Sequence, residues 1–170
     1  MKRLILLLFV VFSNVVFSQS DVFSLARNGT LEEMKAYLKE NPNAINDQTK
    51  EGFTPLILAC YRGNIEVAKF LIENVKDVNA QSSMGTPLMA VAVKGYTDLA
   101  QALLNRDANP NVTDEKGTTA LMYAVQFRNV AFVQLLLKHK ADKTLKDKNG
   151  KTAFEFAVFS GNEEIINLLK

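Results

Sequence analysis

A three-residue phrase recurs four times along the chain at a nearly constant interval. Each copy begins with threonine, continues with proline or alanine and ends with a large apolar residue: Thr54-Pro55-Leu56, Thr86-Pro87-Leu88, Thr119-Ala120-Leu121 and Thr152-Ala153-Phe154. Subtracting the numbers of the threonines gives intervals of 32, 33 and 33 residues. A fixed period of this length indicates an array of small structural units. Such an array offers a long surface rather than a catalytic pocket.

The phrase itself predicts where helices begin. A threonine hydroxyl can accept a hydrogen bond from a free backbone N–H of the first helical turn, and proline suits the position after it. A short helix is then expected to run to about Arg62, where Gly63 can end it in the left-handed conformation. Asn64 is expected to cap a second helix, in which apolar residues recur at helical spacing. The other copies repeat this layout.

A degenerate unit precedes the four clear ones. Its apolar residues fit a first helix near Val22 to Ala26 and a second near Leu31 to Leu38. Ser20 is the expected N-cap of that first helix, with Asp21 favourably placed at the positive end of the helix dipole.

Pairs of short antiparallel helices at about 33 residues per unit resemble the ankyrin repeat family. The clearest unit reads Gly52-Phe53-Thr54-Pro55-Leu56-x-x-Ala59, followed by Gly63-Asn64-Ile65-Glu66-Val67-Ala68. The resemblance implies an all-α, ankyrin-type solenoid of about five stacked helix–turn–helix repeats with projecting hairpin loops. It covers a domain at 20–170, which we divide into repeats of approximately 20–48, 49–80, 81–113, 114–146 and 147–170.

Departures from the family pattern concern the loops and turns. The histidine that the family has after the Thr-Pro-Leu phrase is absent, so we expect the hydrogen bond that stabilises the turn to be missing throughout; the residues there are Ile57, Met89, Met122 and Glu155. Arg128 replaces the glycine between two helices, and we expect Asn129 to compensate, because asparagine tolerates the left-handed region. The loop before Gly85 is one residue short.

The N-terminal segment has the pattern of a signal peptide. Lys2 and Arg3 precede an apolar run at 4–12, and Val16-Phe17-Ser18 fits a cleavage site, so we expect residues 1–18 to be removed after Ser18. An uncleaved membrane anchor is the alternative, but the run is short for a span of about 20 residues. No membrane span is expected after cleavage. We expect a periplasmic or secreted protein from a bacterium.

Charge and composition limit the possible ligands. The chain has 20 Lys and Arg against 18 Asp and Glu, so removing Lys2 and Arg3 with the signal leaves 18 of each and a formally neutral protein. This balance argues against a nucleic-acid partner, which favours a clear positive excess. Cys60 and His139 are single residues of their kinds without companion ligands or nucleophiles in sequence, so no catalytic residue, cofactor or metal site is predicted.

The resemblance places a partner on the concave face, which the loop tips and the first helices form. Carried over position by position, the expected contact residues are Phe53, Tyr61, Arg62, Lys94, Lys116, Gln126, Phe127, Lys148, Lys151 and Phe159. Aromatic and arginine side chains commonly anchor interfaces. One alternative is that some of these rings fold back onto neighbouring repeats, Phe159 above all.

The sequence thus predicts a non-enzymatic, exported and monomeric protein-binding module whose partner is a protein. Two other functions stay open. The first is a thiol- or histidine-dependent activity through Cys60 or His139. The second is binding of an anionic ligand by the region from Lys138 to Lys151, which holds six lysines against two aspartates.

Overall fold

The computed structural model describes residues 21–170. The predicted signal peptide lies outside these residues, and its cleavage stays a prediction. Residues 21–170 form ten α-helices and one 3₁₀ helix without a β-strand: α1 Val22–Asn28, α2 Leu31–Glu40, η1 Pro42–Asn46, α3 Pro55–Arg62, α4 Ile65–Asn74, α5 Pro87–Lys94, α6 Thr97–Asn105, α7 Ala120–Gln126, α8 Val130–Lys138, α9 Ala153–Ser160 and α10 Glu163–Leu169.

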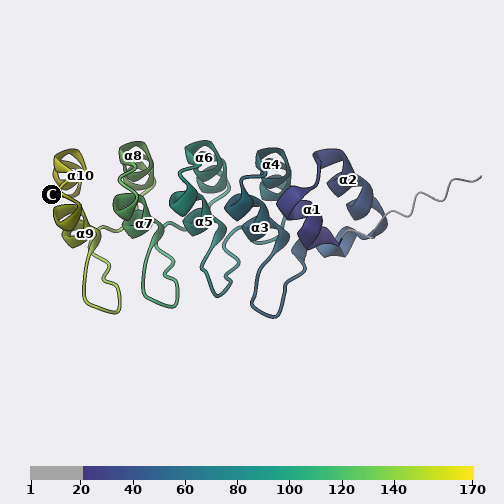
Figure 1. Ribbon diagram of the computed structural model, residues 1–170, viewed down its shortest axis with the longest axis horizontal. Coiled ribbons are helices and arrows are strands. Elements are labelled where there is room, and N and C mark those ends of the chain that lie inside the picture. Colours follow the sequence, from purple (N-terminus) through teal and green to yellow (C-terminus); the bar gives the residue numbers. More distant parts are fainter. Residues whose placement is uncertain (1–20) are drawn as a thin grey trace, which may run out of the picture.

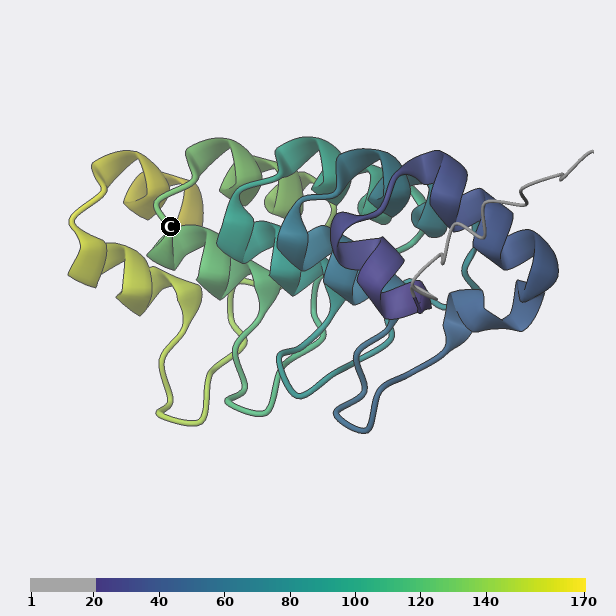
Figure 2. The ribbon, with the colours of Figure 1, turned by 45° about the vertical axis from the view of Figure 1, so that its right-hand side comes forward.

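The helices form five antiparallel pairs that stack along one line. The first helices of successive pairs contact one another from α1 through α3, α5 and α7 to α9, and the second helices do so from α2 to α10. Figure 1 shows the second helices in one row, the first helices in the row beneath, and hairpin loops projecting beyond the first helices. Figure 2 shows the same loops hanging below the first-helix row. The predicted all-α solenoid of about five repeats is confirmed.

The core is a continuous apolar layer between the pairs. In α3 every residue from Pro55 to Cys60 is buried, because one side of the helix faces α1 and the other faces α5. The second helices bury a narrower stripe, such as Val67, Ala68, Leu71 and Ile72 of α4. Burial of such side chains contributes about 1.5–3 kcal/mol each, so the stacking of neighbouring pairs supplies most of the stability.

Threonine caps begin the first helices, as predicted. The side chains of Thr54, Thr86 and Thr119 accept hydrogen bonds from the backbone N–H three residues on. We expected every repeat to lack the hydrogen bond that the family's histidine makes at this turn. In the last repeat this expectation is wrong, because another side chain makes a bond there. There the Glu155 carboxylate accepts from the backbone N–H of Thr152 at 2.7 Å, which completes a capping box.

In residues 21–170 the turn between the two helices contains a left-handed residue in every pair but the first, where Gly29 has a φ of −77°. Gly63, Gly95 and Gly161 supply it with φ values of 74°, 77° and 65°. In the fourth pair Arg128 itself adopts a φ of 56°, while Asn129 has a φ of −88° and accepts from the N–H of Phe132. The expectation that Asn129 would provide the left-handed conformation is therefore wrong, because its side chain is used to cap α8.

Two other expected caps also differ. Asn64 makes no cap bond to α4; its side-chain amide donates instead to the carbonyl oxygens of Gly29 at 2.8 Å and Ala26 at 3.4 Å. Asn64 thus ties the second pair to the first. At the start of α1 the N-cap is Asp21, whose carboxylate accepts from the N–H of Ser24 at 2.6 Å. Ser20, the predicted cap, lies outside the described residues.

None of the helices in residues 21–170 has the length and apolar content that a membrane span needs.

Gly63 and Gly161 allow a matched test of how closely the second and third helix pairs pack at Tyr96. A Cβ on Gly63 would lie 2.2 Å from the hydroxyl oxygen of Tyr96, whereas a Cβ on Gly161 would meet nothing within 4 Å. Both positions have a positive φ. We expect Gly161→Ala to lower the free energy of unfolding by about 1 kcal/mol, and Gly63→Ala to lower it by about 2–3 kcal/mol, because a clash adds to backbone strain. Urea unfolding measures both, and equal losses would contradict the packing role of Tyr96.

Candidate protein-binding face

The loops between pairs end in hairpins of one design. Backbone hydrogen bonds close them between residues 49 and 53, 82 and 85, 114 and 118, and 147 and 151, which we number hairpins 1 to 4. In hairpins 3 and 4 an aspartate carboxylate, Asp114 or Asp147, accepts from two backbone N–H groups of its own turn. The hairpins and the first helices together form one surface, which we call the first-helix face.

Hairpin 2 is one residue shorter than the others. Its closing residues are three positions apart, 82 and 85, where the other hairpins have four. The positive φ falls on Gly85, at 92°, as it does on Gly52, Gly117 and Gly150 in the longer hairpins. Met84 consequently stands at the tip, and 53% of its surface is exposed.

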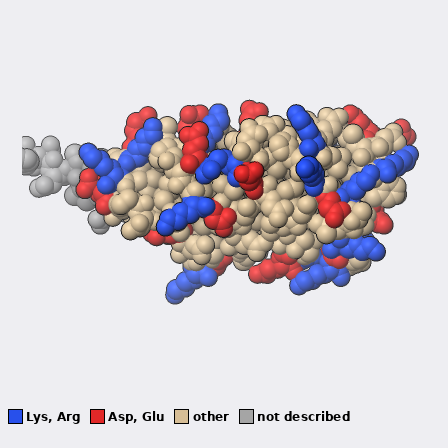
Figure 3. Space-filling view, turned by 180° about the vertical axis from the view of Figure 1, so that it is seen from behind, with Lys and Arg blue, Asp and Glu red and all other residues tan. Residues whose placement is uncertain are grey.

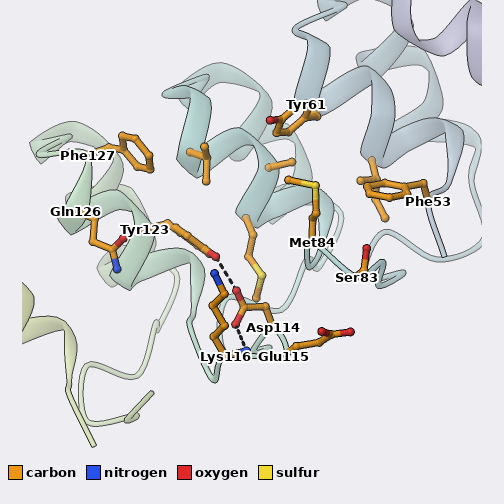
Figure 4. A pocket seen from close by; sticks show the side chains of 14 residues that line it. Phe53, Tyr61, Ser83, Met84, Asp114, Glu115, Lys116, Tyr123, Gln126 and Phe127 are labelled. Carbon is orange, nitrogen blue, oxygen red and sulfur yellow. Dashed lines mark hydrogen bonds between the residues drawn. The ribbon is translucent and has the colours of Figure 1, made fainter. Parts of the chain in front are cut away.

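A hollow of about 320 Å³, which we call the central hollow, opens beside this short hairpin. Side chains from α3, α5 and α7 form its walls, and residues of hairpins 2 and 3 form its mouth (Figure 4). Its main lining residues are Phe53, Tyr61, Met84, Asp114, Tyr123 and Phe127. The hollow is thus largely apolar and has one fixed carboxylate.

The carboxylate of Asp114 is held by three donors. One oxygen accepts from the backbone N–H groups of Lys116 at 2.8 Å and Thr118 at 2.9 Å, and the other accepts from the Tyr123 hydroxyl at 2.6 Å. Burial, this hydrogen bond and the negative charge of Asp114 together raise the pKa of Tyr123 to about 12. The Tyr123 hydroxyl therefore stays protonated, and its bond to Asp114 holds the ring in place as one wall of the hollow.

A second hollow, the C-terminal hollow, lies one repeat further along. It has a volume of about 710 Å³ and is lined by Gln126, Arg128, Lys151, Glu155, Phe156, Val158, Phe159 and Ser160. Gln126 lines both hollows, so the two adjoin. Phe159 is 92% exposed, and the ammonium group of Lys151 lies 5.9 Å from the centre of the Phe156 ring.

The structure brings most of the predicted contact residues together. Phe53, Tyr61, Lys116, Gln126 and Phe127 line the central hollow, while Lys151 and Phe159 line the C-terminal hollow with Gln126. The other three predicted residues lie outside both hollows. Arg62 reaches the side chain of Asn28 at 3.5 Å, the Lys94 ammonium lies 4.5 Å from the centre of the Tyr61 ring, and Lys148 is an exposed residue of hairpin 4.

We considered above that some predicted contact rings fold back onto neighbouring repeats, Phe159 above all. Two other rings do so. Phe53 and Tyr61 are half-buried and pack against the core. Phe127 is 55% exposed and Phe159 is 92% exposed, so the ring that was most suspected of folding back is the most exposed of the four.

Sequence reasoning missed Met84, Tyr123 and Arg128 as lining residues. The short loop before Gly85 was visible in the sequence, but its length alone did not predict an opening beside it. Arg128 was recognised only as a substitute for glycine, whereas its left-handed backbone also directs a cation to the rim of the C-terminal hollow. Tyr123 has no counterpart in the recurring phrase, and only its contact with Asp114 reveals it.

The two residues of the proposed chemical alternative are poorly placed for chemistry. Cys60 is fully buried in α3, and burial raises the pKa of its thiol far above the ordinary value, so the reactive thiolate is disfavoured. His139 ends α8, and its Nε2 lies 3.3 Å from the Gln101 amide nitrogen. In residues 21–170 no group of three or more His, Cys, Asp or Glu side chains is arranged to hold a metal ion.

The lysines from 138 to 151 are spread along the chain from the end of α8, where Lys138 and Lys140 lie, to hairpin 4, which holds Lys148 and Lys151. Figure 3 shows Lys and Arg side chains interspersed with Asp and Glu along the edge where the hairpins of the last repeats project. The two aspartates of the segment are used locally. Asp142 accepts from Thr144, and the backbone N–H of Lys151 holds the pKa of Asp147 below its ordinary value.

The fold and this face define a helical-repeat protein with two adjoining open hollows on its first-helix face. The sequence profile described as ankyrin repeats (3 copies) matches residues 22–114 and, in a second placement, 88–170. The chain therefore belongs to the ankyrin repeat family. Repeats of this family generally mediate protein–protein interactions.

Similar proteins share the repeats over part of their length. Ankyrin repeat and SAM domain-containing protein 6 of Rattus norvegicus is 31% identical over 102 residues, which cover 59% of this chain and 12% of that protein. Ankyrin repeat and KH domain-containing protein 1 of Homo sapiens is 42% identical over 81 residues, 48% of this chain and 3% of that protein. Rabankyrin-5 of Mus musculus is 35% identical over 118 residues, 62% of this chain and 10% of that protein. The matched region is thus a small fraction of each relative.

The bond between Asp114 and Tyr123 predicts a specific alkaline behaviour. Because the folded protein raises the pKa of Tyr123 from 10.0 to about 12, this group stabilises the fold fully below pH 10, and the contribution is lost as the pH rises towards 12. An ultraviolet titration of the four tyrosines should show one late-ionising phenol, which disappears in Tyr123→Phe. Asp114→Asn should bring that ionisation closer to pH 10. An unchanged titration in both variants would contradict the geometry.

Proposed function

We propose that this protein is a non-enzymatic, exported binding module that recognises a protein partner through the concave surface, the first-helix face. The observation that carries the proposal is the pair of adjoining hollows on that face, whose rims hold the exposed rings of Phe127 and Phe159. Partially exposed aromatic rings beside a concavity are typical of residues that anchor interfaces.

The electrostatics of the face favour a protein over an anionic polymer. The central hollow contains Asp114 and Glu115 beside Lys116, and only the C-terminal hollow has an excess of cations. A face of mixed sign directs orientation and partner choice rather than general attraction to polyanions. The alternative of binding an anionic ligand at Lys138–Lys151 has less support, because acidic side chains are interspersed there.

The alternative through Cys60 or His139 also has less support than binding. A fully buried thiol of raised pKa is a poor nucleophile, and Cys60 occupies a position of α3 that packs against neighbouring repeats. We therefore infer that neither residue acts chemically. We also propose that the chain functions as a monomer.

Site-specific photo-crosslinking tests the binding face. A photoreactive phenylalanine analogue replaces Phe127 in one variant and Gln134, an exposed residue of α8 on the opposite row of helices, in the matched control. We expect irradiation in the producing cell to join a partner protein to position 127 and not to position 134. Phe127→Ala should then weaken the complex by about 2 kcal/mol, since truncating a central aromatic removes an anchor. Adducts at position 134 alone would contradict the proposed face.

Export is tested separately from binding. If residues 1–18 are a cleaved signal peptide, the mature protein begins at Gln19 and is found in the periplasm or the medium. Mass spectrometry of the protein from each cell fraction measures both features. A variant without residues 2–18 should remain in the cytoplasm. An intact N-terminus in the cytoplasm of wild-type cells would overturn export and leave the binding proposal standing.

A further inference from the structure

We propose that the first-helix face binds an extended peptide segment with two anchors. A large apolar side chain enters the central hollow, and an acidic side chain, three or four residues further towards the last repeat, reaches Arg128 and Lys151 in the C-terminal hollow. This inference rests on the proposed function and adds the chemistry of the partner to it.

An interruption in the row of hairpins makes room for the segment. A backbone bond joins hairpin 1 to hairpin 2, from the N–H of Ser83 to the carbonyl of Glu51 at 3.0 Å. A second joins hairpin 3 to hairpin 4, from the N–H of Lys148 to the carbonyl of Lys116 at 2.9 Å. Between hairpins 2 and 3 the described residues make no such bond. There side-chain bonds join the two loops at their base, from the Gln81 amide to the carbonyl of Thr113 at 3.2 Å and from the N–H of Asn109 to the side-chain oxygen of Asn79 at 2.7 Å.

The interruption leaves a backbone donor available. Glu115 stands two residues before Gly117, as Lys148 stands two residues before Gly150, so its N–H corresponds to the one that joins hairpins 3 and 4. In residues 21–170 the N–H of Glu115 donates to no other group. The matching carbonyl in hairpin 2 is that of Met84, which precedes Gly85 as Lys116 precedes Gly117, but no bond joins it to Glu115, so this N–H has no acceptor among the described residues. An extended peptide can supply it, because addition of a strand satisfies main-chain groups of this kind.

The central hollow fits a large apolar side chain. Its walls are the rings of Phe53, Tyr61 and Phe127, and the buried thioether of Met89 lies among its lining atoms. Met84 at the mouth is exposed, and its flexible side chain can close over an inserted group. A volume of about 320 Å³ is at the lower end for ligand pockets, which suits one side chain rather than a whole small molecule.

The C-terminal hollow fits a carboxylate. Arg128 and Lys151 provide two cations, and the one acidic residue of the lining, Glu155, already accepts the N–H of Thr152 in the capping box. An arginine guanidinium can bind a carboxylate through two parallel hydrogen bonds. The exposed ring of Phe159 provides apolar contact beside the charge.

The spacing of the two anchors follows from the repeat. The central hollow is lined from α3, α5 and α7 and the C-terminal hollow from α7 and α9, so their centres are more than one helix pair apart. Because packed helices lie about 8–10 Å apart, the centres are about 10–14 Å apart, and an extended chain advances about 3.3 Å per residue. Three or four residues therefore separate the apolar anchor from the acidic one.

A randomised dodecapeptide library displayed on phage, selected against the full chain, tests the inference. We expect enriched peptides to share a large apolar residue and an Asp or Glu three or four positions away. Arg128→Glu/Lys151→Glu should change the selected charge from acidic to basic and weaken binding of the original peptides at least tenfold. Lys39→Glu/Lys69→Glu changes the net charge equally on exposed residues of α2 and α4, and should leave the selection unchanged.

A second variant tests the opening itself. Insertion of one threonine between Gly85 and Thr86, where Phe53, Thr118 and Lys151 stand in the other hairpins, restores the length of hairpin 2. The row of hairpins should then close, and the selected peptides should bind at least tenfold more weakly. Urea unfolding checks that the insertion variant folds. If the insertion variant does not fold, the variant Arg128→Glu/Lys151→Glu tests the inference instead.

Three results would overturn the inference: no enrichment of any peptide, enrichment without the paired anchors, or equal binding to wild type and the charge-reversed variant. Crosslinking from position 127 reports on the proposed function independently. A protein adduct at that position together with any of these three results would retain the binding module and exclude the extended two-anchor peptide.

Discussion

The structure depends on the burial of apolar side chains between helix pairs. No pair covers its own apolar surface, because a first helix such as α3 buries residues on both sides, against α1 and against α5. Each repeat is therefore stabilised by its neighbours, and the period of the sequence is the period of this contact. The polar caps and turns set the geometry, but the stacking supplies the favourable free energy.

The same constraint explains why the last described pair exposes apolar residues. Cys60, Ala92 and Val125 are fully buried, whereas Val158 at the equivalent position is 53% exposed. In residues 21–170 the helix α9 has a first helix, α7, on one side only. The exposed ring of Phe159 is next to Val158 and is part of the same uncovered surface. This apolar surface adjoins Arg128 and Lys151, which gives the C-terminal hollow its combination of ring and charge.

The hairpins convert a regular stack into an irregular surface. Asp114 and Asp147 use the same carboxylate-to-backbone bonds to fix hairpins 3 and 4, and Asp114 also holds Tyr123 through its second oxygen. Loss of a single residue in hairpin 2 interrupts the pairing of adjacent hairpins at one junction. The opening lies where no backbone hydrogen bond joins two neighbouring hairpins, so a change of loop length accompanies an altered surface on an unchanged helical stack.

The fold and much of the candidate site could be predicted from the sequence. Seven of the ten predicted contact residues line the two hollows, because position within a repeat determines which face a side chain occupies. The residues that do not line a hollow show that position within a repeat does not determine which neighbour a side chain contacts. Arg62 and Lys94 extend to Asn28 and Tyr61, and long side chains of this kind choose partners by tertiary contact. The roles of Asn64 and Asn129 were also wrong in detail, because similar asparagines either tie two pairs together or cap a helix.

The sequence by itself determined the array: the interval between threonines, the caps, and the alternation of first and second helices all follow from local hydrogen bonding and apolar periodicity. Only the tertiary structure decided which surface residues converge. The central hollow joins Phe53 to Phe127, residues two repeats apart, and the missing bond between hairpins 2 and 3 is a relation between neighbouring loops. Such relations arise from the stacking of separate units, so they cannot be predicted from a sequence pattern that repeats within each unit.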